Sequence, residues 1–295
     1  MYSSSEGPLV SVCIPVFNHS DFVAECIESV IAQSYKNIEL IIIDDGSTDV
    51  SCSIVERYID ACETRFRRFK YISRPNVGVS ETLNEGLRWS KGKYFCGLAS
   101  DDIIFPDKTS SLVNYLENYS STVAVFGSVY LIDENSKKIG KRIANASYNF
   151  EDIFLLRAEL PAPAALIRLE ALNSVGGFDS NTKVEDWDMW LKLSNGTHSN
   201  IAVIPGLLAG YRVHSSNTWK QLDAMHAAKI EIIKKYSDHK KYPCALVVVG
   251  CARFRDLSIV RKKESLQILF SILYHAQTYK EIRFYQGLVY LFFRW

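Results

Sequence analysis

The sequence lacks an excess of charge of either sign, because 34 Lys and Arg residues are nearly balanced by 33 Asp and Glu residues, giving a net charge of +1. Domains that bind nucleic acid usually carry a strong basic excess, so nucleic acid is not expected as the main partner. No uninterrupted apolar stretch reaches the ~18 residues of a membrane-spanning helix. Residues 1–8 lack the basic flank and apolar segment of a signal peptide. We therefore expect a cytoplasmic protein.

The sequence also lacks paired cysteines at Cys-x-x-Cys spacing, although it contains seven cysteines. Neither a zinc knuckle nor a thioredoxin-like redox site is indicated. Most of the cysteines lie within apolar runs, where a free thiol acts as a small hydrophobic side chain, as expected in a reducing compartment. With 47% apolar residues in 295, the chain can bury a sizeable core as one large domain, or as one domain with an appendage.

The first hundred residues alternate between strand and helix patterns. Short apolar or β-branched runs occupy residues 9–17, 38–43, 69–73 and 94–99, and apolar residues at helical spacing lie between them. This alternation predicts parallel βαβ units. Their crossovers are right-handed, so the carboxyl ends of the strands share one edge of the sheet, which is where ligands bind in open α/β sheets.

Polar clusters follow all four predicted strands, at residues 18–20, 44–47, 74–76 and 100–102. The adjacent acids Asp101 and Asp102 are costly to bury unless a cation neutralises them, and Mg²⁺ or Mn²⁺ bridges carboxylates to substrate phosphates. The alternative is that Asp102 or Asp107 caps the next helix. One carboxylate of the segment 44–49 can accept a hydrogen bond from a nucleobase or a ribose, or the segment is a plain turn before a helix.

Two candidates for chemistry lie in the second half of the chain. Asp186, next to Glu185 and before an aromatic helix, is either a helix cap or a general base. His214 follows a predicted strand, where a lone histidine is often structural, but carboxylates facing it would make it a plausible metal contact. Strands are expected at 123–126, 129–132, 164–167 and 207–213, and helices at 219–236, 264–276 and 280–293, with 234–241 as a linker.

These residues resemble, in order and spacing, the motifs of family 2 glycosyltransferases of the bacterial polysaccharide and lipopolysaccharide type. The resemblance covers roughly residues 8–216, and its motifs are residues 11–18, 41–49, 76–80 with Asn84, 92–94, 100–102, 176–179, 185–186 and 211–214. It implies a GT-A fold, which is an α/β fold with a mostly parallel central sheet flanked by helices. We therefore expect a catalytic domain over 1–218 and a helical C-terminal region over 219–295.

The resemblance also implies roles for individual residues. Asp186 matches the catalytic base. The acceptor side would involve Gly177, Glu185 and Trp187. The metal, Mn²⁺ or Mg²⁺, would be held by Asp102, Asp101 and His214, with Ser-Asp-Asp replacing a strict Asp-x-Asp motif. The nucleotide-sugar pocket would be lined by Pro15, Phe17, Asn18, Asp45, Arg74 and Asp101.

The implied reaction is an inverting transfer of a sugar from a nucleotide-diphosphate sugar, with a UDP-sugar favoured, to a hydroxyl of a glycan or lipid-linked acceptor. A metal-dependent phosphohydrolase or phosphotransferase, and a non-catalytic nucleotide-sugar-binding module, are the alternatives. The C-terminal region carries an apolar stripe at Leu266, Leu269, Phe270 and Leu273. It would pack on the catalytic domain, join a second subunit as a homo-oligomer, or contact the inner face of the cell membrane peripherally.

Overall fold

The structure is a computed structural model, and it describes residues 7–144, 147–196, 200–214 and 221–293. The chain divides into two compact units. Unit 1 comprises residues 1–149, 159–180 and 189–215, and unit 2 comprises residues 150–158, 181–188 and 216–295. The predicted boundary between residues 218 and 219 lies outside the described residues. Two segments that the prediction assigned to 1–218, namely 150–158 and 181–188, belong to unit 2.

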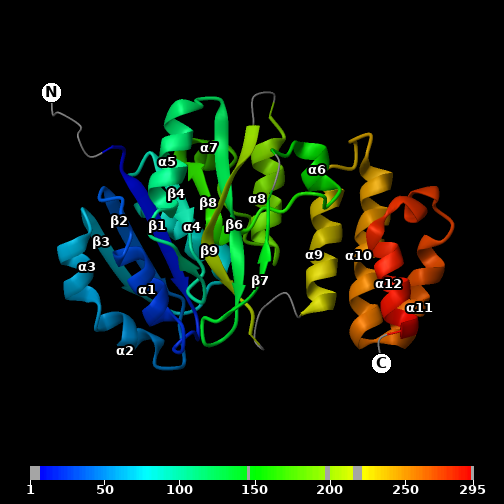
Figure 1. The fold of residues 1–295 in the computed structure, drawn as a ribbon, viewed down its shortest axis with the longest axis horizontal. Helices are drawn as coiled ribbons and strands as arrows, with labels where there is room; N and C mark the ends of the chain where they lie inside the picture. Colours follow the sequence, from blue (N-terminus) through cyan, green and yellow to red (C-terminus); the bar gives the residue numbers. More distant parts are fainter. Residues whose placement is uncertain (1–6, 145–146, 197–199, 215–220, 294–295) are drawn as a thin grey trace. The chain divides into compact units, whose positions relative to one another are not determined.

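Unit 1 contains a sheet that has nine strands in the described part of the chain, in the order β3-β2-β1-β4-β8-β6-β9-β5, with β7 paired to β6 (Figure 1). Its parallel part confirms the four strands predicted in the first hundred residues: β1 (Val10–Val16), β2 (Ile38–Asp44), β3 (Arg68–Ser73) and β4 (Tyr94–Gly97). Val10 of β1 pairs with both Ile38 and Tyr94. The carboxyl ends of β1, β2 and β4 therefore lie at one edge.

Side-chain alternation along β1 explains why helices cover both faces of this part of the sheet. Val12 and Ile14 pack in the same buried cluster as Val23 and Ile27 of α1 (Val23–Ile31). Cys13 points the other way, toward α4 (Val79–Trp89). The remaining helices of unit 1 are α2 (Ser51–Glu56), α3 (Ile59–Arg65), α5 (Lys108–Asn118), η1 (Ala162–Ala164) and α7 (Leu169–Ser174).

The other part of the sheet combines antiparallel pairings with a long parallel pairing of β6 and β9, so the sheet as a whole is mixed. It contains β5 (Ile103–Ile104), β6 (Thr122–Ile132), β7 (Lys138–Arg142), β8 (Ala165–Arg168) and β9 (Asn200–Arg212). The residues predicted as strands at 123–126 and 129–132 are confirmed as strand, but they form one strand, β6, and not two. Gly127 continues that strand, and a Cβ atom there would lie 2.6 Å from the Leu208 side chain, so the glycine allows close packing rather than a turn.

Strand β9 begins earlier than the predicted 207–213. The pairing with β6 shifts register between Phe126 and Ser128, which face Val203 and Leu207. Pro205 and Gly206 lie in this irregularity, where a missing N–H and a positive φ are tolerated. The sequence pattern there resembles the end of a strand, although the strand continues through it.

Unit 2 is helical. It contains α6 (Phe150–Phe154), α9 (Leu222–Lys234), α10 (Tyr242–Val260), α11 (Lys262–Ile272), η3 (Ala276–Lys280) and α12 (Ile282–Phe293), and α8 (Glu185–Ser194) begins in it and ends in unit 1. Helix α10 was not predicted, because its apolar residues lie on all sides. Its Cys251 and Phe254 pack with Leu269 of α11 and with Phe284 of α12.

Several large apolar side chains of α11 and α12 are exposed, among them Phe270, Ile282, Val289 and Phe292. The predicted contact of this region with a second copy or a membrane surface stays a prediction. None of the described helices combines the length and apolarity needed to cross a membrane.

The close approach of α4 to β1 gives a prediction. A Cβ atom on Gly86 would collide with the Cys13 side chain, so Gly86→Ala should lower the free energy of unfolding by about 1–3 kcal/mol through overpacking. Arg88→Ala, at an exposed position of the same helix, is the control and should change it by less than about 0.5 kcal/mol. Urea unfolding followed by circular dichroism measures both. Equal stability of the two variants would show that α4 can move away from the sheet at no cost.

Candidate functional site

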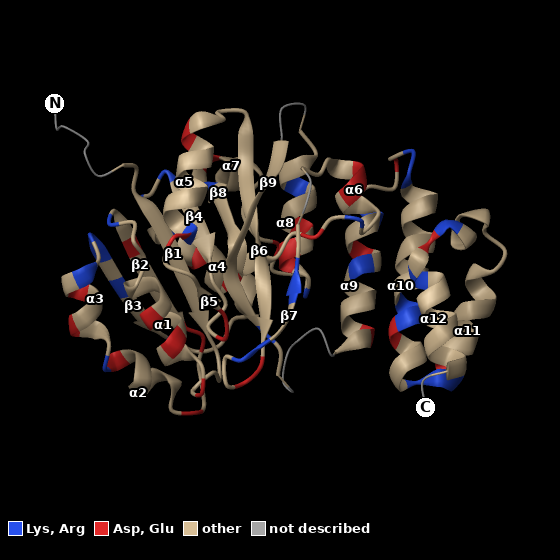
Figure 2. Ribbon diagram, in the orientation of Figure 1, with Lys and Arg blue, Asp and Glu red and all other residues tan. Residues whose placement is uncertain are grey.

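The loops that follow β1, β2 and β4 meet at one edge of the unit 1 sheet, and they are rich in acidic residues (Figure 2). Asn18 joins the first two loops: its side-chain oxygen accepts a hydrogen bond from the Thr48 N–H at 2.8 Å, and its own N–H donates to Ser47 Oγ at 3.0 Å. Asn18 has a φ of 52°, a left-handed conformation that asparagine tolerates. Of the other predicted pocket residues, Phe17 is exposed and Pro15 is half-buried.

Asp45 and Arg74 are brought together at the ends of β2 and β3. The Asp45 carboxylate accepts a hydrogen bond from the Arg74 guanidinium, and it also accepts one from the N–H of Val77 at 2.8 Å and one from that of Gly78 at 2.9 Å. Arg74 is held by a second ion pair, with Glu85 of α4 at 2.8 Å. Both predicted nucleotide-pocket residues therefore have fixed positions.

The segment that carries Asp101 and Asp102 is held by Arg212 at the end of β9. The Arg212 side chain is fully buried. Its Nε donates to the Asp101 carbonyl at 2.6 Å, and its backbone N–H donates to Asp102 Oδ1 at 2.8 Å. Nη1 donates to the Asp133 carbonyl at 2.9 Å, and Nη2 pairs with Glu25 Oε2 at 2.6 Å. The capping alternative for Asp102 does not hold, because α5 begins only at Lys108.

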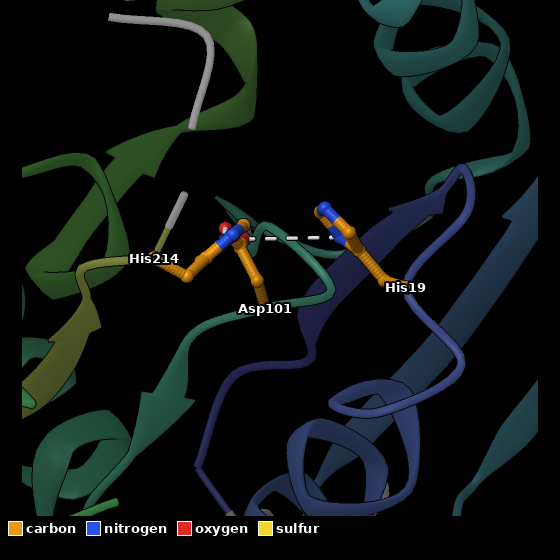
Figure 3. A group of neighbouring side chains, drawn as sticks. All are labelled: His19, Asp101 and His214. Atoms are coloured by element: carbon orange, nitrogen blue, oxygen red, sulfur yellow. Dashed lines mark hydrogen bonds and ion pairs between the residues drawn. The ribbon is translucent and has the colours of Figure 1, made fainter. Parts of the chain in front are cut away.

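Three side chains from three loops surround one point at this edge: His19 after β1, Asp101 after β4 and His214 after β9 (Figure 3). His214 Nε2 lies 2.8 Å from Asp101 Oδ2, and His19 Nδ1 lies 4.0 Å from Asp101 Oδ1. The two imidazole rings are 5.8 Å apart between centroids. One ligand atom from each of the three residues lies within 4.8 Å of the others.

This group fits a divalent metal ion. Bonds from a metal to imidazole nitrogen and carboxylate oxygen are about 2.0–2.2 Å long, so two ligand atoms on one ion are at most ~4.4 Å apart. The ligand atoms lie within 4.8 Å of one another, so shifts of side-chain atoms by well under 1 Å bring them within this limit. Asp102 is not part of the group, and its predicted role as a metal ligand stays a prediction.

The two adjacent acids differ in their electrostatic surroundings. Burial raises the pKa of Asp101, but the hydrogen bond from His214 and the charges of His19 and His214 outweigh it and bring that pKa below its usual value. Burial, together with the negative charge of Asp101, raises the pKa of Asp102 well above its usual value. Burial lowers the pKa of His19, which favours the neutral imidazole that a metal needs.

The glycine loop at the predicted acceptor side is held by α4. The Asn84 side chain forms two hydrogen bonds with the backbone of Phe178, each of 2.8 Å. Gly177 has a φ of +71°, and a Cβ atom there would lie 2.6 Å from Asn84 Oδ1. Only glycine therefore fits at this position.

Unit 2 contains the other predicted residues, at the start of α8. Asp186 Oδ1 accepts a hydrogen bond from the Trp187 N–H at 2.7 Å. Burial raises the pKa of Asp186, while the positive charge of Lys229 on α9 acts in the opposite direction. Burial and the charge of Asp186 raise the pKa of Glu185 to about 7. Trp187 is buried, and its indole N–H donates to the Ile153 carbonyl at 3.0 Å.

The structure thus brings together Asp45 and Arg74, which were both predicted for the nucleotide pocket, and Asp101 and His214, which were both predicted for the metal site; their roles stay predictions. The sequence prediction did not include His19, Arg212 or Glu25. His19 lies in the polar cluster 18–20 at the end of a predicted strand, and that position was the available signal. Arg212 lies inside the recognised motif 211–214, but nothing in the sequence pairs it with Glu25, 187 residues away.

Sequence comparisons with known proteins point to one family. The sequence profile of Glycosyl transferase family 2 matches residues 11–174. An uncharacterized glycosyltransferase of Rickettsia prowazekii (strain Madrid E) is 32% identical over 219 residues, which cover 72% of this chain and 66% of that protein. The chain spans between 31% and 68% of the lengths of its rickettsial relatives.

Solved structures show the same fold at low sequence identity. TarS 1-349 from S. aureus in complex with UDP-GlcNAc has a TM-score of 0.66 at 15% identity, covering 90% of this chain and 79% of that chain. The mannosyltransferase PcManGT from Pyrobaculum calidifontis, in complex with GDP-Man and Mn²⁺, has a TM-score of 0.59 at 16% identity, covering 98% of this chain and 86% of that chain.

The profile covers more than half of the sequence, so the chain belongs to glycosyl transferase family 2. The predicted family and the predicted GT-A type of α/β fold are confirmed. Membership of a family of transferases supports the predicted class of enzyme over the alternatives of a phosphohydrolase and a non-catalytic module.

The burial of Arg212 gives a prediction for this site. Arg212→Met removes the side-chain donor to the Asp101 carbonyl and the ion-pair partner of Glu25, so the free energy of unfolding should fall by about 3 kcal/mol or more. Arg57→Met, at an exposed position of the same unit, should change it by less than about 1 kcal/mol. Urea unfolding measures the difference. A loss no larger than that of the control would show that the segment 100–102 is held by other contacts.

The raised pKa of Glu185 predicts a pH dependence. The folded chain keeps a proton on Glu185 up to about pH 7, whereas the unfolded chain loses it near the usual value of 4.5. Stability should therefore fall as the pH rises through this window. Glu185→Gln cannot ionise, so its Tm should exceed that of the wild type by a few degrees at pH 7.5 and match it at pH 4.5.

Differential scanning fluorimetry at the two pH values measures this difference. Glu231→Gln, at an exposed position of unit 2, is the control and should show no such trend. If the Tm of Glu185→Gln exceeded that of the wild type equally at both pH values, the difference in Tm would not come from ionisation of Glu185.

Proposed function

We propose that the chain transfers a sugar from a nucleotide-diphosphate sugar to a hydroxyl group of a glycan or a lipid-linked acceptor, with inversion at the anomeric carbon. The observation that carries this proposal is the convergence of Asp45, Arg74, Asp101, His19 and His214 at the carboxyl edge of the unit 1 sheet. Charged and metal-ligating groups at that edge suit a nucleotide and its diphosphate.

Asp45 is suited to recognise the nucleobase. A carboxylate has about four lone-pair positions, and Asp45 accepts three hydrogen bonds from Arg74, Val77 and Gly78. One position is left for an N–H of a base. A UDP-sugar is the favoured donor. It agrees with TarS, which was solved with UDP-GlcNAc, while GDP-Man in PcManGT marks the main alternative.

Asp186 is the proposed general base. Its pKa is raised by burial, which brings it closer to the operating pH and makes it a better proton acceptor. The hydrogen bond from the Trp187 N–H and the positive charge of Lys229 act in the opposite direction. Glu185 is also proposed for the acceptor side, and the hydrogen bond of the buried Trp187 indole fixes the start of α8.

The proposed reaction is a single displacement. The acceptor oxygen forms a bond to the anomeric carbon as the bond from that carbon to the diphosphate oxygen breaks, and Asp186 takes the proton of the acceptor hydroxyl. Arg74 and Asp45 hold the nucleotide, and Arg212 holds the segment 100–102 in place. Asp101 and His214, with Asp102 as a further candidate, would hold Mn²⁺ or Mg²⁺, which when bound neutralises charge on the leaving diphosphate.

Donor binding and turnover test this proposal separately. UDP-, GDP- and dTDP-sugars, each with and without Mn²⁺, are compared by thermal shift, since a ligand that binds only the folded state raises the Tm. A UDP-sugar with Mn²⁺ should give the largest shift. No shift with any nucleotide sugar would contradict the proposal.

Turnover is followed as release of the nucleoside diphosphate. Asp186→Asn should lower the rate by about 10²–10⁴-fold, the usual contribution of a general base, while the donor-induced Tm shift is kept. Asp223→Asn, an exposed acid of unit 2, should leave the rate unchanged. Turnover of Asp186→Asn at the wild-type rate would show that another group takes the proton.

A further inference from the structure

His19 is the one member of the group His19, Asp101 and His214 that no motif explains, and its position is fixed by its backbone. The His19 N–H donates to Ser51 Oγ at 3.0 Å. Its carbonyl accepts hydrogen bonds from the N–H groups of Phe22 at 3.0 Å and Val23 at 2.9 Å, where α1 begins. These contacts fix the backbone of His19 next to Asp101, and the imidazole itself packs against the Phe22 ring at 6.1 Å between ring centroids.

The Asp101 carboxylate presents one oxygen to each imidazole. Oδ2 lies 2.8 Å from His214 Nε2, within hydrogen-bond distance. Oδ1 lies 4.0 Å from His19 Nδ1, which is too long for a hydrogen bond. This separation lies within the ~4.2 Å that two metal–ligand bonds of about 2.1 Å each can span at most. In the described contacts, His19 Nδ1 lies 2.8 Å from Ser100 Oγ, a neutral group that a cation can replace.

Solvent reaches the group from one side. The His214 side chain is 2% exposed, whereas that of His19 is 24% exposed. The tilted Phe22 ring closes the site next to His214, at 4.9 Å between ring centroids. A cation held by the three residues would therefore keep open positions on the side of His19, where water or phosphate oxygens can complete its coordination.

We propose that His19 is a direct ligand of the site's cation, and that the resulting set of two imidazoles and one carboxylate selects a first-row transition-metal ion over Mg²⁺. This inference rests on the proposed function only for the use of a divalent cation. Mg²⁺ prefers oxygen ligands and gives up its water reluctantly, whereas imidazole favours the transition metals, with affinity rising from Mn²⁺ to Co²⁺ and beyond. Asp102, whose Oδ1 accepts the Arg212 N–H, stays a further candidate ligand.

The test is metal binding by the full chain after chelator treatment. Isothermal titration calorimetry gives the affinities for Co²⁺, Mn²⁺ and Mg²⁺, each with and without UDP. Pulsed electron paramagnetic resonance of bound Mn²⁺ counts the coordinated imidazole nitrogens. His19→Ala removes the ligand and keeps the backbone hydrogen bonds. His275→Ala is the matched control, because His275 is exposed and lies in unit 2.

The wild type should bind Co²⁺ and Mn²⁺ more tightly than Mg²⁺. In the resonance spectrum, bound Mn²⁺ should couple to nitrogens of two imidazoles. His19→Ala should weaken Co²⁺ binding by at least about tenfold, show one coupling, and lower the preference for Co²⁺ over Mg²⁺. The control should match the wild type. Unchanged affinity and couplings in His19→Ala, equal wild-type affinity for Mg²⁺ and Co²⁺, or no binding of Co²⁺ or Mn²⁺ would each overturn the inference.

The inference and the proposed function fail in different ways. If His19→Ala loses metal affinity as expected but no nucleotide sugar is turned over, the metal site stands and the transfer reaction is wrong. If nucleotide sugars are turned over but His19→Ala binds metal as the wild type does, the reaction stands and His19 is not a ligand.

Discussion

The buried guanidinium of Arg212 is the interaction on which the site of unit 1 depends. It joins the end of β9 to the Asp101 carbonyl after β4, to the Asp133 carbonyl after β6, and to Glu25 of α1. A buried charge must be paired and fully hydrogen-bonded to be tolerated, so the loops that supply these acceptors have one arrangement. His214 follows Arg212 by two residues and therefore reaches Asp101 in a fixed orientation.

The sequence was sufficient for the parallel part of the sheet. Strands β1, β2 and β4 are short apolar runs between helices because each is buried on both faces, and the edge strand β3, which is only partly buried, lies at the expected place in the alternation. The later strands were harder to predict. Gly127 in β6 and Pro205 in β9 look like strand breakers, yet one permits close packing and the other lies in an irregularity of the pairing. Helix α10 has no polar side and so lacks the amphipathic signal.

The same limit applies to the site. Asp45 with Arg74, and Asp101 with His214, could be predicted because each residue lies at a strand end within a recognisable motif. His19 could not, because a histidine next to Asn18 has no distinctive spacing. Its importance follows from a distance to Asp101 that depends on the backbone of the loop after β1. Whether a titratable side chain is a ligand depends on separations of about an ångström, which the order of residues does not encode.

The three residues of the metal group come from distant parts of the chain, with His214 lying 113 residues after Asp101. The sequence profile of the family ends at residue 174, before β9 begins. The part of the chain that the profile matches therefore contains the loops proposed to face the nucleotide but only two of the three side chains proposed to bind the metal. Because the proposed ion site needs the last strand to pair beside β6, ion affinity would report that folding of unit 1 is complete.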